Sequence, residues 1–288
     1  MTVQTDRLPL LDRLVLGRSS HKPSNLLAQA ENAACVMEAV AYVAGEPWSD
    51  RPRCTSPVLT DYAITLNDRL DDANRQLLVP LIPRLIGTRD DGKDEARRAL
   101  AKRALMTEWL PQWLRLANLD DLAAKAEAGA ELSGPQLTTA LREIRDLTWQ
   151  ARRDRWAPFR AEVERLLREK WGAEKAAAAA AAADAAAVAA ADADADADAA
   201  AAAVAAAVAV AAADAVADAD AVAAAAAAAD ADGKLTWEQR DRIYSEIRKA
   251  MREHYAASDT FAKVRELRDM QIRAGIDLLD RMIDPSAA

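Results

Sequence analysis

The chain has 288 residues, a net charge of −8 and a hydrophobic fraction of 51%, which suffices for one core of ordinary size. The negative charge is local: residues 176–232 hold ten aspartates and no basic residue, whereas residues 1–175 and 233–288 each sum to +1. Since both flanks are nearly neutral, the chain has no global electrostatic attraction for nucleic acid, and nucleic-acid binding is not expected.

The first twenty residues carry charges throughout and lack the apolar core of a secretory signal. The alanine-rich run further on is long enough to cross a bilayer, but its aspartates are too costly there. We therefore expect a cytoplasmic protein without membrane association, in which Cys35 and Cys54 are reduced thiols.

Residues 24–44 place apolar side chains at helical spacing. These positions are Leu27, Ala30, Ala34, Met37, Val40 and Ala44. Ser24 can cap the start of this helix, Gly45 suits its end, and Pro47 blocks its continuation. The pattern predicts a helix with Cys35 well inside it.

The next helix is predicted to open at Ser56, because a capping serine is followed there by Pro57 at the first helical position. A short helix follows from about Asp72. Pro80 and Pro83 then predict a break or a kink, since proline removes a backbone donor and clashes with the preceding turn.

Residues 93–119 form a long amphipathic segment that is interrupted near Pro111. Its apolar stripe consists of Leu100, Ala104, Leu105, Trp109, Trp113 and Leu116. Further helical patterns begin at Ser133 and Ala151. No stretch alternates apolar and polar residues as a strand would, so the sequence predicts an all-α protein.

Residues 176–232 consist of 41 Ala, 10 Asp and 6 Val. Alanine has the highest helix propensity, and a continuous helix here would be roughly 85 Å long at about 1.5 Å per residue. Like charges four residues apart, such as Asp192 and Asp196, oppose it. We favour a helix frayed around 191–199, with a disordered tether as the alternative. An ice-binding face would need regularly spaced threonines, which the tract lacks.

Beyond the tract, Thr236 and Gln239 make a capping box for another helix. The final helical pattern has near-heptad spacing and is predicted to pack against another helix. Its apolar positions are Phe261, Val264, Leu267, Ile272, Ile276, Leu279 and Met282.

These patterns divide the chain into four parts. They are an N-terminal helical domain (1–130), connecting helices (131–175), the Ala/Asp/Val low-complexity segment (176–232) and a C-terminal helical segment (233–288).

The candidates for a catalytic or metal site are His21, Cys35, Glu38 and Cys54. A reactive cysteine often lies at a helix N-terminus, whereas Cys35 is predicted inside a helix, where buried cysteine usually serves as a small hydrophobic residue. Glu38 could partner Cys35 or face water. The four residues could bind a metal chemically, but their spacing fits no zinc-binding pattern. We expect no catalytic residue, no metal and no cofactor.

The end of the tract resembles part of a calcium loop, because Asp230, Asp232 and Leu235 fall on loop positions. Ala228 and Gln239 occupy the first and twelfth positions, where the loop needs its most important carboxylates. Calcium binding is therefore not expected.

A basic and aromatic segment runs from Arg142 to Lys170 and includes Trp149 and Trp156. Tryptophan beside arginine can stack on bases. The local excess of positive charge is small, so the segment is interpreted as an amphipathic helix with a solvated basic face.

Two stretches, 35–68 and 75–91, carry a specific motif. Its residues are Cys35, Met37, Glu38, Ala39, Ala44, Gly45, Glu46, Ser49, Asp50, Cys54, Pro57, Val58, Asn67, Asp68, Arg84, Leu85, Gly87 and Thr88. Over about the first 120 residues the chain resembles a family of uncharacterised helical proteins from actinobacteria, other bacteria and phages of actinobacteria. Relatives also carry alanine-rich repeats and a last helix similar to residues 278–283. They bring a histidine-containing segment closer to the cysteine than it is here.

The resemblance implies no activity, because the family has none assigned. We expect a non-enzymatic, phage- or prophage-associated structural or interaction protein, whose C-terminal helices bind a protein partner or another copy. The alternative is a thiol- or metal-dependent enzyme, or a metal-binding domain, centred on Cys35, Glu38 and Cys54.

Overall fold

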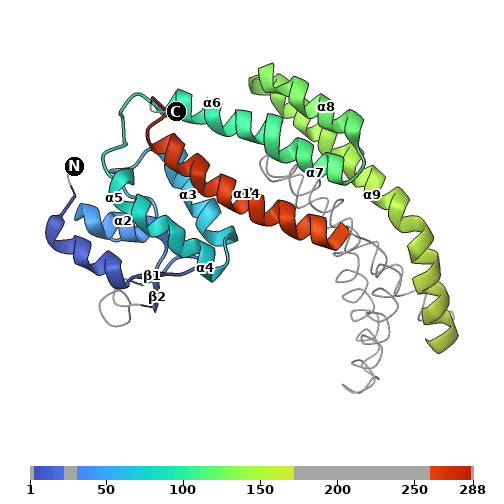
Figure 1. Cartoon of the computed structure of the whole chain (residues 1–288), viewed down its shortest axis with the longest axis horizontal. Coiled ribbons are helices and arrows are strands. Elements are labelled where there is room, and N and C mark those ends of the chain that lie inside the picture. The colour runs from blue at the N-terminus through green and yellow to red at the C-terminus, as the bar shows by residue number, and fades with distance from the viewer. Residues whose placement is uncertain (1–2, 23–30, 172–259, 287–288) are drawn as a thin grey trace. The chain divides into compact units, whose positions relative to one another are not determined.

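A computed structural model of the protein describes residues 3–22, 31–171 and 260–286 (Figure 1). Regular structure in these ranges is nearly all helical, which confirms the predicted all-α class. The described strands are β1 (Val15–Leu16) and β2 (Glu31–Ala34), which pair in parallel. The chain forms two compact units, Met1–Ala104 with Arg268–Ala288 (the first unit) and Leu105–Leu267 (the second unit).

The first unit contains β1, β2 and short helices, and it is completed by the C-terminal part of the last helix. The helices are η1 (Thr5–Arg13), α2 (Val36–Ala44), α3 (Pro57–Arg69), α4 (Asp72–Arg75), η2 (Gln76–Leu81), α5 (Ile82–Leu85), α6 (Asp94–Arg103) and α14 (Thr260–Ile283).

Helix α2 is the central element of the first unit, because eight of its nine residues are buried. A helix that is apolar on all sides needs partners on all sides. It ends as predicted at Gly45, whose φ of 74° lies in the left-handed region that glycine tolerates best. A Cβ at this position would lie 3.2 Å from Cγ of Gln4, so the close approach of the N-terminal segment also favours glycine.

The predicted start of α3 is confirmed, since the Ser56 hydroxyl accepts a hydrogen bond from the Leu59 amide and Pro57 takes the first helical position. The predicted break at the two prolines is also confirmed. Pro80 lies inside the 3-10 helix η2, and Pro83 lies in the first turn of α5.

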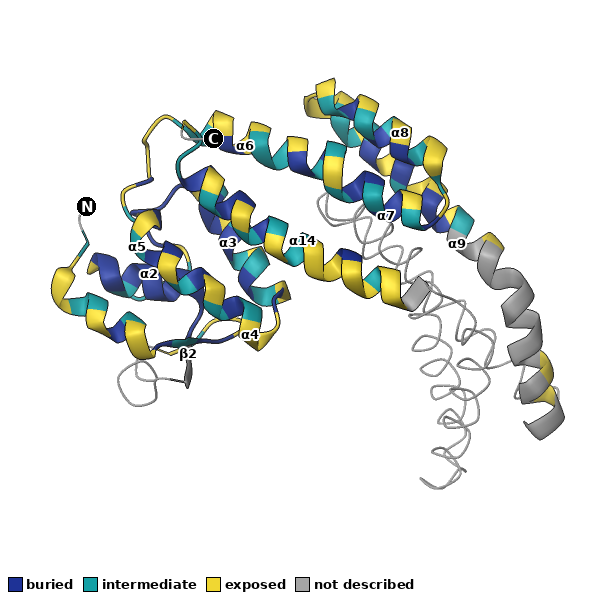
Figure 2. Ribbon diagram, in the orientation of Figure 1, coloured by how far each residue is buried: buried dark blue, intermediate teal, exposed yellow. Residues whose placement is uncertain are grey.

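Helix α14 buries one side of its C-terminal part in the first unit (Figure 2). Its buried apolar side chains from Arg268 onward are Leu278, Leu279, Met282 and Ile283. Gly275 permits a close approach to α3: a Cβ there would lie 3.3 Å from Cδ1 of Leu66. The Tyr62 hydroxyl donates to the Gly275 carbonyl at 3.0 Å.

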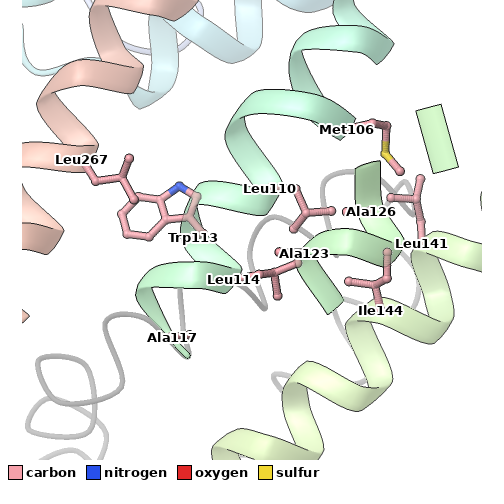
Figure 3. Packing of buried hydrophobic residues seen from close by; sticks show 10 residues of the cluster. All are labelled: Met106, Leu110, Trp113, Leu114, Ala117, Ala123, Ala126, Leu141, Ile144 and Leu267. Atoms are coloured by element: carbon pink, nitrogen blue, oxygen red, sulfur yellow. The ribbon is translucent and has the colours of Figure 1, made fainter. Parts of the chain in front are cut away.

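The second unit packs helices around its own apolar core. Its helices are the π-helical turn η3 (Ala104–Trp109), α7 (Leu110–Leu116), α8 (Asp120–Ala128), η4 (Gly129–Glu131) and α9 (Gly134–Trp171). The core consists of Met106, Leu110, Trp113, Leu114, Ala117, Ala123, Ala126, Leu141, Ile144 and Leu267 (Figure 3). The predicted interruption near Pro111 takes the form of η3, which precedes this proline.

Helix α9 joins the patterns that begin at Ser133 and Ala151 into one element of 38 residues. The Ala/Asp/Val tract, the capping box at Thr236 and the proposed cap at Ser24 lie outside the described residues. The helical or tethering character of the tract therefore stays a prediction.

Candidate functional site

The prediction that Cys35 lies inside a helix is wrong, because Cys35 is the residue that caps α2. Its sulfur accepts from the Glu38 amide at 3.5 Å, and the Glu38 carboxylate accepts from the Cys35 amide at 2.8 Å. This is a reciprocal capping box in which cysteine replaces the usual serine or threonine. The residues just before it, Glu31–Ala34, form β2 and not the first turns of a longer helix.

Glu38 connects the helix start to His21. Its carboxylate accepts from the His21 amide at 2.7 Å and lies 3.0 Å from the His21 Nδ1. Because an ionised carboxylate only accepts hydrogen bonds, the His21 Nδ1 is the donor when it binds one. The Glu38 side chain is 2% exposed and that of His21 13%. Three of the four predicted candidates, His21, Cys35 and Glu38, are thus brought together.

The His21 segment is held by further contacts from the first unit. The Trp48 indole donates to the His21 carbonyl at 2.8 Å, and the Ser19 amide donates to the Asp68 carboxylate at 2.9 Å. Ser19 has a positive φ of 67°, which is uncommon for a residue other than glycine. These contacts fix the course of the chain before residue 23.

Cys54, the fourth candidate, belongs to a separate set of contacts in the loop before α3. Its carbonyl accepts from the amides of Gly87 (2.9 Å) and Arg89 (3.2 Å), and its sulfur lies 3.7 Å from the Thr55 hydroxyl. Glu46 accepts from the Arg53 amide at 2.6 Å. The loop from Gly45 to Ser56 is therefore anchored by the residues of the motif themselves.

Both cysteines are buried free thiols. Burial raises the pKa of Cys35 to about 12, and the negative charge of Glu38 contributes to this. Burial is also the main reason why the pKa of Cys54 is raised. Each side chain is consequently a neutral thiol near pH 7, and a neutral thiol is a poor nucleophile and a poor metal ligand.

The metal candidates are not arranged as a coordination site. In residues 3–22, 31–171 and 260–286, no three His, Cys, Asp or Glu side chains are placed to bind one metal ion. The calcium-like positions Asp230 and Asp232 lie outside these ranges.

Asn67 has a structural role that the sequence patterns did not indicate. This buried side chain accepts from the Val36 amide at 3.2 Å and donates to the Gly17 carbonyl at 3.0 Å. It thereby joins α3, the first turn of α2 and the end of β1. The adjacent Asp68, which binds Ser19, shares this task, and the Asn-Asp pair of the motif was the available signal.

Arg97 is the second position that the sequence patterns missed. It lies on α6 and is fully buried. Its guanidinium donates to the Asp91 carboxylate at 2.5 and 2.7 Å and to Asp94 at 2.9 Å. The same group donates to the carbonyls of Met282 (2.9 Å) and Ile283 (3.3 Å) at the end of α14.

In the basic and aromatic segment, Trp149 lies on α9 and is buried, with 8% of the residue exposed. This placement favours the interpretation of the segment as an amphipathic helix. A ring in that position is not available for stacking on a base. The Trp156 side chain lies outside the described residues.

Comparison with protein-family models, with curated proteins and with solved structures finds no match to this chain. Across the part of the chain that the structure describes, no helix combines the length and apolar character that crossing a membrane requires.

Proposed function

We propose that this is a non-enzymatic structural or interaction protein of the cytoplasm, associated with a phage or prophage. It acts by binding a protein partner or another copy of itself through its helical ends. The observation that supports this most directly is the use of Glu38, whose buried carboxylate binds two backbone amides and the His21 ring. A carboxylate committed to the backbone in this way holds a fold together.

The other polar residues of the motif support the same proposal. Asn67 binds the backbone of two other elements, and Ser56 binds both the Leu59 amide and the Asp94 carboxylate. The Thr88 hydroxyl accepts from the Ser56 amide at 3.0 Å and donates to the Leu85 carbonyl at 2.8 Å. These polar side chains of the motif bind the backbone of their own chain, which supports a structural role for them.

Light scattering of the full chain over a wide range of concentration tests the proposal. The comparison variant lacks residues 176–232 and keeps α14. Removing residues 233–288 is the less informative design, because it would expose the surface that Leu278, Leu279 and Met282 cover. We expect the full chain to form a defined oligomer or a stoichiometric complex with one partner. A chain that stays monomeric and retains no protein contradicts the proposal.

A second candidate, the thiol- or metal-dependent function, is favoured by one observation: Glu38 contacts both His21 and Cys35. The raised pKa of Cys35 opposes the thiol version, which leaves the His21 ring as the group to test for metal binding. Metal analysis of the purified protein and of His21→Ala tests it. One bound metal per chain that the variant loses would support this candidate.

A further inference from the structure

We propose that two copies of this chain pair through the exposed side of α14, antiparallel to each other and related by a twofold axis. The contact is made by one row of alternating charges, here called the charge row, which consists of Asp269, Arg273, Asp277 and Arg281. The inference rests on the proposed self-association and names the surface that produces it.

The charge row lies on one side of α14, because its residues are four positions apart and such positions form a ridge along a helix. All four residues are exposed (Figure 2). The opposite side of the helix holds Leu278, Leu279 and Met282, which are buried. The whole charge row belongs to the part of α14 that the first unit contains. The surface is therefore defined within this unit alone.

The first unit does not use these four charges itself. Among the four, all of which the structure describes, there is no ion pair, although Asp269 and Arg273 have the spacing that permits one within a helix. The acidic residues of α14 that bind the first unit are different ones: Asp280 pairs with Arg84, and Asp284 pairs with Lys93 at 2.7 Å. The charge row is therefore available to a second molecule.

The charge row is complementary to itself when the second copy runs antiparallel. Its signs alternate from negative at Asp269 to positive at Arg281, and an antiparallel copy presents them in reverse order. Asp269 then meets Arg281 of the second copy, and Arg273 meets Asp277. A parallel copy in register would place like charges together, which is unfavourable. The sign pattern thus selects a second copy of this chain and fixes its direction.

The residues beside the charge row permit two helices to pack. Ridges of residues four apart run at roughly 26° to the helix axis, so helices that pack by such ridges cross at about 50°. Met270, which is 49% exposed, and the small Ala274 lie beside the charge row and border the groove for the ridge of the second copy. A twofold pair contains each contact twice and uses the surface of both copies, so association stops at the dimer.

Single charge reversals in the full chain test the pairing. Arg273→Asp places an aspartate opposite Asp277 of the second copy, and Asp277→Arg places an arginine opposite Arg273. Since each contact occurs twice, we expect either variant to raise the dissociation constant of the dimer about tenfold or more. Sedimentation equilibrium at low salt measures this constant, and circular dichroism shows that the fold is kept. The matched control is Arg98→Asp, which makes the same change of charge at an exposed position of α6.

Combining the two reversals distinguishes this pairing from a general effect of charge. A mixture of the Arg273→Asp and Asp277→Arg chains restores every contact between opposite charges in the heterodimer, and a chain with both substitutions restores them in the homodimer. We expect both to dimerise about as tightly as the original chain. Equal affinity in all the variants, or single variants that neither combination restores, overturns the proposal.

Failure of the pairing and failure of the proposed function give different results. An original chain that forms an oligomer whose affinity none of the reversals changes removes this pairing and leaves self-association by another surface. An original chain that stays monomeric at every concentration removes both the pairing and self-association.

Discussion

Arg97 and Met282 are joined by a hydrogen bond of 2.9 Å, in which the buried guanidinium Nε donates to a backbone carbonyl in the last turn of α14. The last carbonyls of a helix lack partners within the helix and attract positive charge. Asp91 and Asp94 neutralise the same guanidinium, so a charge can be buried here without being left unpaired. One side chain thus joins α6 to a helix far along the sequence.

Replacing Arg97 with alanine should lower the free energy of unfolding by about 3 kcal/mol or more, because removal of one partner of a buried charged group leaves the others unsatisfied. Denaturant unfolding measures the loss. The matched control is Arg98→Ala, since Arg98 is 59% exposed and its pair with Glu95 contributes about 0–1 kcal/mol. Small and equal losses for the two variants would contradict the role given to Arg97.

Glu38→Ala should destabilise the protein by about 2–4 kcal/mol, since it leaves the buried amides of His21 and Cys35 without an acceptor. His21→Ala should have a smaller effect, about 1 kcal/mol, because its backbone amide still binds Glu38. Thermal and denaturant unfolding report both values. Glu95→Ala serves as the control, as that carboxylate is 90% exposed. Equal stability of Glu38→Ala and the control would disprove the capping role.

Both cysteines should react slowly with a thiol reagent in the folded protein and quickly after unfolding. A rise in the pKa of Cys35 from its ordinary value of 9.0 to about 12 reduces its thiolate fraction at pH 8 about a thousandfold. Reaction with a chromogenic disulfide at pH 8, with and without denaturant, measures the difference. A folded-state rate for Cys35 equal to that of a free thiol would revive the thiol candidate.

Stability should decline in acid between about pH 4 and pH 2. The hydrogen bond from Arg97 is the main cause that lowers the pKa of Asp91, and the one from Lys93 is the main cause that lowers the pKa of Asp284 to about 2. A folded-state pKa below the ordinary 3.8 means that the folded protein binds protons less tightly. The stabilisation that each of these carboxylates contributes is therefore complete at pH values above its ordinary pKa. It is lost as the pH falls through the lowered pKa of the folded protein.

Unfolding curves at several pH values test this decline. Asp91→Asn should make the fall between pH 4 and pH 2 shallower, because the titrating group is gone. A variant with the same dependence on pH as the original chain would show that Asp91 does not contribute to it.

Local signals predicted some of the helix boundaries. Ser56 followed by Pro57 marks the start of α3, and Gly45 marks the end of α2, because capping depends on a few adjacent residues. The start of α2 was missed since cysteine is not among the usual capping residues. The apolar positions before Cys35 continued the helical spacing, although β2 pairs with β1 in that stretch.

The candidate site was predicted only in part. His21, Cys35 and Glu38 were named as candidates, but their common role in the capping of α2 depends on a contact between residues 17 positions apart. The bond between Arg97 and Met282 spans 185 positions. Helical periodicity describes which face of a helix is buried and carries no information on which distant helix will cover it.

The closing of the first unit by α14 has a consequence for synthesis on the ribosome. Residues 1–104 leave the exit tunnel long before the helix that completes their packing has been translated. At about 5–20 residues per second, this nascent portion waits several seconds or more with an apolar surface open to chaperones or to a neighbouring nascent chain on the same messenger. The order of translation thus delays the completion of the first unit until the last helix of the chain has been made.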